Sequence, residues 1–436
     1  MKRLTLTVLG PLICSGLMHA DTIADWNSIS IQTILAAGTL RPGATGFLDL
    51  AVMHAAMFDA VESIDGRFHV FHFAVPGASG SPAAAAAKAA HDVLTNHFPG
   101  QAASHDATYH SYLSSNGIAE RDPGVLVGQH AAASIIALRA GDASFPNPPP
   151  PDFNGGTDPG VWRPTISYLP GPPPSNAPML VPWAATVTPF TLNSPSQFRA
   201  KDPPALTSGK YTHAYNEVKD LGSFASTARS PEQTELAYFW AANYMVLWNQ
   251  VLRDLAGAHV QNLGDSARLF ALVSMAMADA FITAWDTKRH YVFWRPVTAI
   301  QEGDNDGNPF TVGDPNWQPL INTPNYPEYT SGANNVTGAV TRMLKLFFRS
   351  DKMTFSATTT NPLALQQTRT YDRFSDAAHD VVNARIYEGI HYRFSDVVAR
   401  RQGRQVAKWA FTHFLRPIGD QDNDADDDDD QEEDEN

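Results

Sequence analysis

Apolar residues recur every three or four positions along most of the chain, which is the periodicity of amphipathic helices. In the first third this pattern covers residues 31–38, 47–65 and 81–98, and the last of these begins at Ser81 and Pro82, which favour a helix start. In the second half it covers 231–256, 266–291, 336–348, 371–389 and 400–415. No convincing set of strands accompanies it. The sequence therefore predicts an all-α protein built as a helical bundle, with two long helices at 231–256 and 266–291.

A proline-rich segment interrupts this pattern at residues 146–205. It holds 17 of the 32 prolines, and proline is excluded from helix interiors and central strands. We expect a long irregular connection between an N-terminal helical region, 21–145, and a C-terminal one, 206–418. A flexible linker between two domains is the alternative. We favour packing on the surface, because large apolar residues usually bury something and four are interspersed here: Trp162, Tyr168, Trp183 and Phe190.

The first 20 residues have the composition of a secretory signal peptide. Lys2 and Arg3 precede an apolar stretch, 4–17, and Ala20 is a plausible cleavage residue. A single membrane anchor is the alternative, but the apolar stretch is short for a span, and no later segment reaches about 18 uninterrupted apolar residues. We therefore expect a secreted or periplasmic protein with no integral membrane domain.

Charge and cysteine content narrow the function classes. The formal charge is −14, but residues 420–436 hold twelve Asp or Glu and no Lys or Arg, so the rest of the chain is close to neutral. No large basic surface is left for nucleic acid. The acidic tail, 419–436, is expected to be disordered and solvated, with calcium binding as the alternative. Cys14 is the only cysteine and lies in the signal, which excludes disulfides, thiolate metal sites and cysteine nucleophiles from the mature protein.

Three segments of the C-terminal region carry residues that suit a tetrahedral oxyanion. Lys288 and Arg295 are seven residues apart, so on one helix ended by Pro296 they would share a face. A solvent-facing pair of cations is the alternative. Ser331 and Gly332 precede a helical pattern, where amides at a helix start bind anions, although a plain helix cap would look the same.

Arg385 and His391 form the third segment. A gap of six residues would place them about 120° apart on an unbroken helix, but Gly389 could end the helix and turn His391 back. A neutral imidazole there could coordinate a metal oxide or attack phosphorus. A structural histidine is the alternative for His391 alone.

These segments resemble the three signature motifs of the type 2 phosphatidic acid phosphatase and vanadium haloperoxidase superfamily. The first motif, Lys, six residues, then Arg-Pro, is intact from Lys288 to Pro296. The second, Pro-Ser-Gly-His, is represented by Thr330 to Ala333. The third, Ser-Arg, five residues, then His and an Asp shortly after, is represented by 384–396, with Asp396 one residue later than usual. The wider chain, 21–418, resembles secreted bacterial members.

The resemblance implies a role for each residue. Lys288, Arg295 and Arg385 would bind the oxygens of vanadate or phosphate, with Ser331 and the Gly332 amide adding hydrogen bonds. His391 would ligate vanadium in a peroxidase or form a phosphohistidine in a phosphatase, and Asp396 would orient it through its other ring nitrogen.

One departure from the family pattern separates the possible chemistries. The second histidine, the general acid and base of the family, is Ala333 here. Expelling an alkoxide from a phosphomonoester needs a proton donor, whereas vanadate with peroxide carries its own protonatable oxygens. Four residues could replace the missing group: Glu328, Asn334, Asn335 and His290. We expect a vanadate-dependent peroxidase acting on peroxide and a halide or organic substrate. A phosphohydrolase and a low-activity oxyanion binder are the alternatives, and the oligomeric state stays open.

Overall fold

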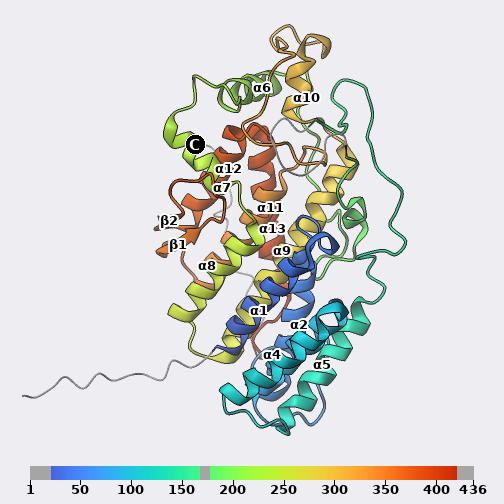
Figure 1. Cartoon of the computed structure of the whole chain (residues 1–436), viewed down its shortest axis with the longest axis vertical. Helices are drawn as coiled ribbons and strands as arrows, with labels where there is room; N and C mark the ends of the chain where they lie inside the picture. The colour runs from blue at the N-terminus through green and yellow to red at the C-terminus, as the bar shows by residue number, and fades with distance from the viewer. Residues whose placement is uncertain (1–20, 167–176, 420–436) are drawn as a thin grey trace, which may run out of the picture.

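A computed structural model of the chain describes residues 21–166 and 177–419 (Figure 1). The predicted signal peptide, Tyr168 and the acidic tail after residue 419 lie outside these ranges. The chain forms the following elements: α1 (Thr22–Ala37), α2 (Gly46–Asp65), α3 (Pro82–His97), α4 (Ala102–Ser115), α5 (Pro123–Arg139), α6 (Gly209–Leu221), α7 (Pro231–Trp240), α8 (Tyr244–His259), α9 (Leu263–Tyr291), α10 (Pro296–Gln301), α11 (Gly332–Phe348), β1 (Phe355–Thr358), β2 (Thr368–Tyr371), α12 (Phe374–Tyr387) and α13 (Arg393–His413).

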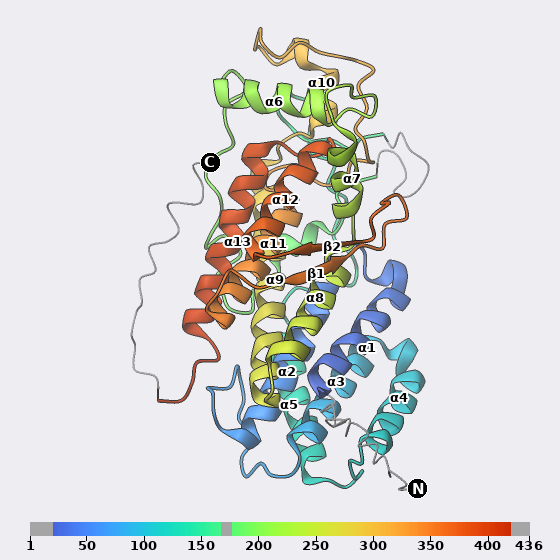
Figure 2. The same ribbon diagram turned by 90° about the vertical axis from the view of Figure 1, so that its left-hand side faces the viewer.

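Helix α9 is the centre of the molecule. It packs against α2 on the N-terminal side and against α11 and α13 on the C-terminal side, and Figure 2 shows α9, α11 and α13 side by side. Among the described helices, α9 alone is long and apolar enough to cross a membrane, and 94% of its most apolar window is buried inside the protein. A helix that is apolar all round belongs in a protein core, and α9 fills that place here.

The N-terminal helices form the end of the molecule opposite α6 and α10 (Figure 1). Helices α2, α3 and α5 pack on one another. The helix α3 starts as its sequence predicts, because the Ser81 side chain accepts a hydrogen bond from the Ala84 amide and Pro82 is its first residue. Six alanines of α3 between residues 84 and 90 are fully buried. Such small side chains allow close approach of the neighbouring helices.

The proline-rich connection packs against the C-terminal helices. The Trp162 amide donates to the Val292 carbonyl at 2.7 Å, and the Trp294 amide donates to the Gly160 carbonyl at 3.0 Å. Farther along, the Phe190 and Thr191 amides each donate to the Asp279 carboxylate at 2.7 Å. Trp162 and Phe190 are buried and Trp183 is half-buried. The described parts of the connection therefore bury their large apolar residues against α9 and the loop that follows it.

Two secondary-structure expectations are wrong in detail. Residues 231–256 form two helices, α7 and α8, because Asn243 starts a new helix by accepting hydrogen bonds from the Met245 and Val246 amides. A short antiparallel hairpin of β1 and β2 also forms, with Phe355 paired to Tyr371. Both aromatic side chains are buried, so the hairpin covers the outside of α8 and α12 rather than forming a sheet core.

Candidate active site

Lys288 and Arg295 do not share a helix, which corrects the expectation that they would. Lys288 is in the last turn of α9, and Val292 then turns the chain in a left-handed conformation. Arg295 is the residue that precedes α10, so Pro296 begins a helix instead of ending one. Proline suits a first helical position because its φ is already helical there. Both cations are 0% exposed, which excludes the alternative of a solvent-facing pair.

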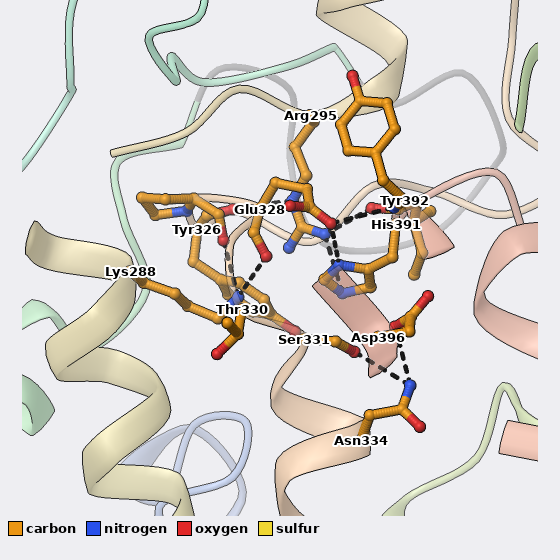
Figure 3. A network of polar contacts seen from close by, with 12 residues as sticks. Lys288, Arg295, Tyr326, Glu328, Thr330, Ser331, Asn334, His391, Tyr392 and Asp396 are labelled. Carbon is orange, nitrogen blue, oxygen red and sulfur yellow. Dashed lines mark hydrogen bonds and ion pairs between the residues drawn. The ribbon is translucent and has the colours of Figure 1, made fainter. Parts of the chain in front are cut away.

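Both cations bind the backbone of the loop that leads into α11 (Figure 3). The Lys288 Nζ donates to the carbonyl oxygens of Pro327 and Glu328, at 2.8 and 2.9 Å. The Arg295 Nε donates to the Tyr326 carbonyl at 2.9 Å. The loop before the second motif is therefore fixed by the two cations of the first motif.

His391 closes the site from the third motif. Helix α12 ends at Tyr387, and Gly389 adopts a φ of +80°, a conformation open to glycine at little cost. The turn brings the His391 Nε2 to 3.2 Å from the Arg295 Nη1. A guanidinium only donates hydrogen bonds, so Nε2 accepts and the ring proton is on Nδ1. Nδ1 donates to the Glu328 Oε1 at 2.7 Å.

The carboxylate that orients His391 is Glu328, and the expectation for Asp396 is wrong on this point. Asp396 lies in the first turn of α13, fully buried, and accepts a hydrogen bond from the Asn334 Nδ2 at 2.8 Å. It therefore joins α13 to the start of α11. Glu328 also accepts from the Tyr392 amide at 3.1 Å, so its carboxylate fixes both the imidazole and the backbone beside it.

The second motif provides the start of a long helix. Ser331 precedes α11, and no side chain caps the first amides of this helix, which leaves them available to an anion. Gly332 has Trp285 close by, since an added Cβ would lie 3.3 Å from the indole ring. The backbone of Gly332 and the methyl of Ala333 face a cavity of about 450 Å³ that Arg385 also lines.

Arg385 completes the set of cations. Its Nη1 pairs with the Glu388 Oε2 at 2.6 Å, and both side chains are buried. The Arg385 Nε and the Arg295 Nη2 are buried and have no hydrogen-bond partner in the described part of the chain. A buried donor without a partner is costly, and two such donors on cations suit a bound oxyanion. Lys288, Arg295, Ser331, Gly332, Arg385 and His391 therefore converge, as the resemblance implies.

Comparisons with known proteins agree with this geometry. The family model of the VCPO second helical-bundle domain matches residues 268–420. The vanadium chloroperoxidase of Curvularia inaequalis is 35% identical over 182 residues, which covers 34% of this chain and 29% of that protein. This part of the chain is therefore similar to the vanadium haloperoxidases. The match spans 29% of the chloroperoxidase, and residues 268–420, which the family model matches, include all three motifs.

Solved structures of the vanadium haloperoxidases share the fold over most of the chain. A bacterial vanadium-dependent iodoperoxidase superposes with a TM-score of 0.76 at 24% identity, covering 91% of this chain and 98% of that one. A holo-type bacterial vanadium-dependent chloroperoxidase gives 0.70 at 16% identity, covering 85% and 91%. The predicted all-α bundle is confirmed.

Burial sets the charge state of this haloperoxidase-like site. Burial and then the Arg295 charge lower the pKa of Lys288 well below its ordinary value. Burial, followed by the charges of Arg295, Lys288 and Arg385, likewise lowers the pKa of His391. The imidazole is therefore neutral, with its Nε2 lone pair among cations. Such an arrangement can ligate a metal oxide or attack a phosphoryl group.

The pKa values of the buried carboxyl groups of the site are shifted in the opposite direction, upward. Burial raises the pKa of Glu328 to about 7, although the Arg295 and Lys288 charges act against it. Burial also raises the pKa of Glu388 to about 7, against the charge of Arg385. Burial raises the pKa of Asp396 well above its usual range. Near neutral pH these shifts leave the positive charges of Arg295 and Arg385 only partly balanced, so a bound anion would relieve their repulsion.

A pH dependence of stability follows from these two glutamates. The ionised form of Glu328 is disfavoured in the fold, so its contribution to stability is present below a pH of about 4.5 and is lost as the pH rises through about 7. Without added anion, the free energy of unfolding should fall over this window by up to about 3 kcal/mol from Glu328. Urea denaturation at pH 5 and pH 8.5 measures the fall.

Variants assign this pH dependence to its source. Glu328→Gln should reduce the fall in the free energy of unfolding between pH 5 and pH 8.5 and leave the part of the fall that comes from Glu388. Glu120→Gln, at a side chain that is 70% exposed, should leave the whole fall unchanged. An unchanged fall in Glu328→Gln would contradict the assignment.

The structure shows where the four residues that could replace the missing histidine lie. His290 is exposed at the end of α9. Asn334 is held by Asp396, and Asn335 donates to Thr330 and Gln402. Glu328 contacts the Nδ1 side of His391, away from the Nε2 that faces the cations. None of the four therefore takes the position of the family histidine, which is that of Ala333.

Two functional residues were not assigned these roles from the sequence. The sequence suggests Glu328 only as a replacement acid, because its pairing with His391 across 63 positions leaves no signal in the spacing. Glu388 is three residues from Arg385 in the same segment, and such pairs contact each other on a helix. The spacing in the sequence could therefore have indicated the pairing of Arg385 with Glu388.

Proposed function

We propose that this protein binds vanadate at the converged cations and uses peroxide to oxidise a halide or an organic substrate. The observation that carries the proposal is the set of three buried cations around the Nε2 of a neutral histidine. Within residues 21–166 and 177–419, two of these cations keep buried donors without a partner, Nη2 of Arg295 and Nε of Arg385. A tetrahedral oxyanion supplies the missing acceptors.

Each residue of the site would make a different contact with the anion. Lys288, Arg295 and Arg385 would balance the charge of its oxygens, and the uncapped amides at Gly332 would bind them at the start of α11. His391 would offer its Nε2 as the ligand, in the tautomer that Glu328 selects by accepting from Nδ1. Bound vanadate supplies a Lewis-acid centre at which peroxide becomes an oxidant.

A phosphohydrolase is the second function that the same donors would support. Phosphate has the same shape, and His391 could act as its nucleophile. However, a phosphomonoester needs a proton for its leaving group, and the side chain at position 333 is a methyl. The relatives reported above are also peroxidases by name. We therefore place peroxidase activity first.

The test is reconstitution of the purified protein with orthovanadate. We expect one vanadium per chain after removal of excess vanadate, and peroxide-dependent oxidation of iodide or bromide that phosphate inhibits by competition. Hydrolysis of p-nitrophenyl phosphate should be weak by comparison. Phosphatase turnover with no vanadate-dependent oxidation would overturn the proposal, and failure to retain either anion would identify a binder without turnover.

A further inference from the structure

A second binding region adjoins the anion site. The cavity of about 450 Å³ has Gly332, Ala333 and Arg385 on one side. Its other walls come from distant parts of the chain: Phe47 of α2, Leu180 of the proline-rich connection, and residues 241–245 between α7 and α8. Its volume far exceeds the needs of a halide ion or a peroxide molecule, and it is typical of sites that bind small organic molecules.

Aromatic rings form a continuous wall from the N-terminal side of this cavity to the cations. The Phe47 and Phe281 ring centroids are 6.4 Å apart, those of Phe281 and Trp285 are 4.4 Å apart, and those of Trp285 and Tyr326 are 5.0 Å apart. The Tyr326 ring then has the Lys288 Nζ at 4.9 Å from its centroid. Figure 3 shows Tyr326 beside the anion-site residues. A molecule stacked on this wall would lie next to the bound anion.

The charge of the lining favours a neutral ligand. Among the described residues that line this cavity, Arg385 is the one Lys, Arg, Asp, Glu or His, and it already belongs to the anion site. An anionic organic molecule would compete with vanadate for Arg385. The other walls offer aromatic, aliphatic and backbone surface, which suits an uncharged aromatic ring system.

Ala333 connects this cavity to the anion site. It is half-buried and lines the cavity with only a methyl group, at the position where the superfamily pattern has a histidine. An imidazole there would project into space that the methyl leaves open. The departure from the pattern therefore enlarges the room for an organic molecule beside the anion.

We propose that the cavity binds a neutral aromatic molecule as the acceptor in the oxidation. This inference rests on the proposed function for its chemistry, although binding itself does not need vanadate. In the step with a halide present, the halide loses two electrons and the aromatic C–H bond is replaced by a carbon–halogen bond. Hydrogen peroxide accepts the two electrons as its O–O bond breaks. The proton from carbon, together with one from solvent, completes two molecules of water.

The test uses 2-naphthol and isothermal titration of the vanadate-free, full-length protein. Ala242→Phe fills the cavity from the segment between α7 and α8, and Ala44→Phe fills it from the residues just before α2. Each should weaken 2-naphthol binding by about tenfold or more. Ala103→Phe makes the same chemical change at an exposed position of α4 and should leave the affinity unchanged. Two filling variants keep the test valid if one of them misfolds.

The outcomes separate this inference from the proposed function. If 2-naphthol binds with the predicted sensitivity and vanadate is not retained, the cavity assignment stands and the peroxidase proposal fails. If vanadate loads and bromide is oxidised, but 2-naphthol binds equally to all variants or to none, the cavity assignment is overturned.

Discussion

His391→Ala should remove vanadate-dependent oxidation, with kcat/KM for iodide lowered by at least about 10³-fold. The imidazole is a neutral nitrogen ligand placed among the three cations, and loss of a carboxylate behind such a ligand alone costs about 10–100-fold. Loss of the ligand itself should cost more. Vanadium content after gel filtration and initial rates of triiodide formation measure the effect.

Two matched variants accompany this prediction. His391→Asn keeps a polar side chain in the buried position, where it can still contact Glu328, so it tests whether the alanine variant fails for structural reasons. His290→Ala removes an exposed histidine from the end of α9 and should keep full activity. Retention of vanadium and activity in both His391 variants would show that the metal oxide is held elsewhere.

Ala333→His should give the largest gain of function. A histidine at the second position of α11 would face the cavity beside the Gly332 backbone and Arg385, where it could transfer protons to a bound anion. General acid–base catalysis contributes about 10²–10⁴-fold. We expect phosphomonoester hydrolysis to rise within this range, and halide oxidation to rise less, because vanadate with peroxide depends less on a protein acid.

Ala333→Phe is the control for this gain. It adds a ring of comparable size that transfers no proton, so it should raise neither activity. Both variants should also weaken 2-naphthol binding, because both reduce the cavity. If neither activity rises in Ala333→His, another group already performs proton transfer, and the importance given to position 333 would be wrong.

The helical bundle was predictable because its signals are local. Apolar periodicity identified α2, α9 and α11, and Ser81 with Pro82 marked the start of α3. The break between α7 and α8 also had a local signal in Asn243, but the apolar pattern continues across it and conceals the break. Val292 is a β-branched residue in a left-handed conformation, which sequence propensities do not predict, so the two cations of the first motif were assigned to one helix.

The residues that form the site could be predicted from the sequence, but the hydrogen bonds between them could not. Motif spacing identified the three cations, Ser331, Gly332 and His391. The carboxylate behind His391 depends on how the loop at Tyr326 to Thr330 folds across the end of α9, which is a tertiary property. Glu328 and Asp396 are both acidic residues near a motif, and only the geometry shows that the first contacts the imidazole.

The proline-rich connection has a consequence for the independence of the two helical regions. Its backbone is hydrogen-bonded on both sides of Phe293, two residues before Arg295, and it contributes Leu180 to the wall of the cavity. A fragment that began at residue 206 would therefore leave Val292 and Asp279 without these partners and expose the apolar surface of α9. We therefore expect residues 268–420 not to fold on their own, and to melt together with the helices that precede them in one cooperative transition.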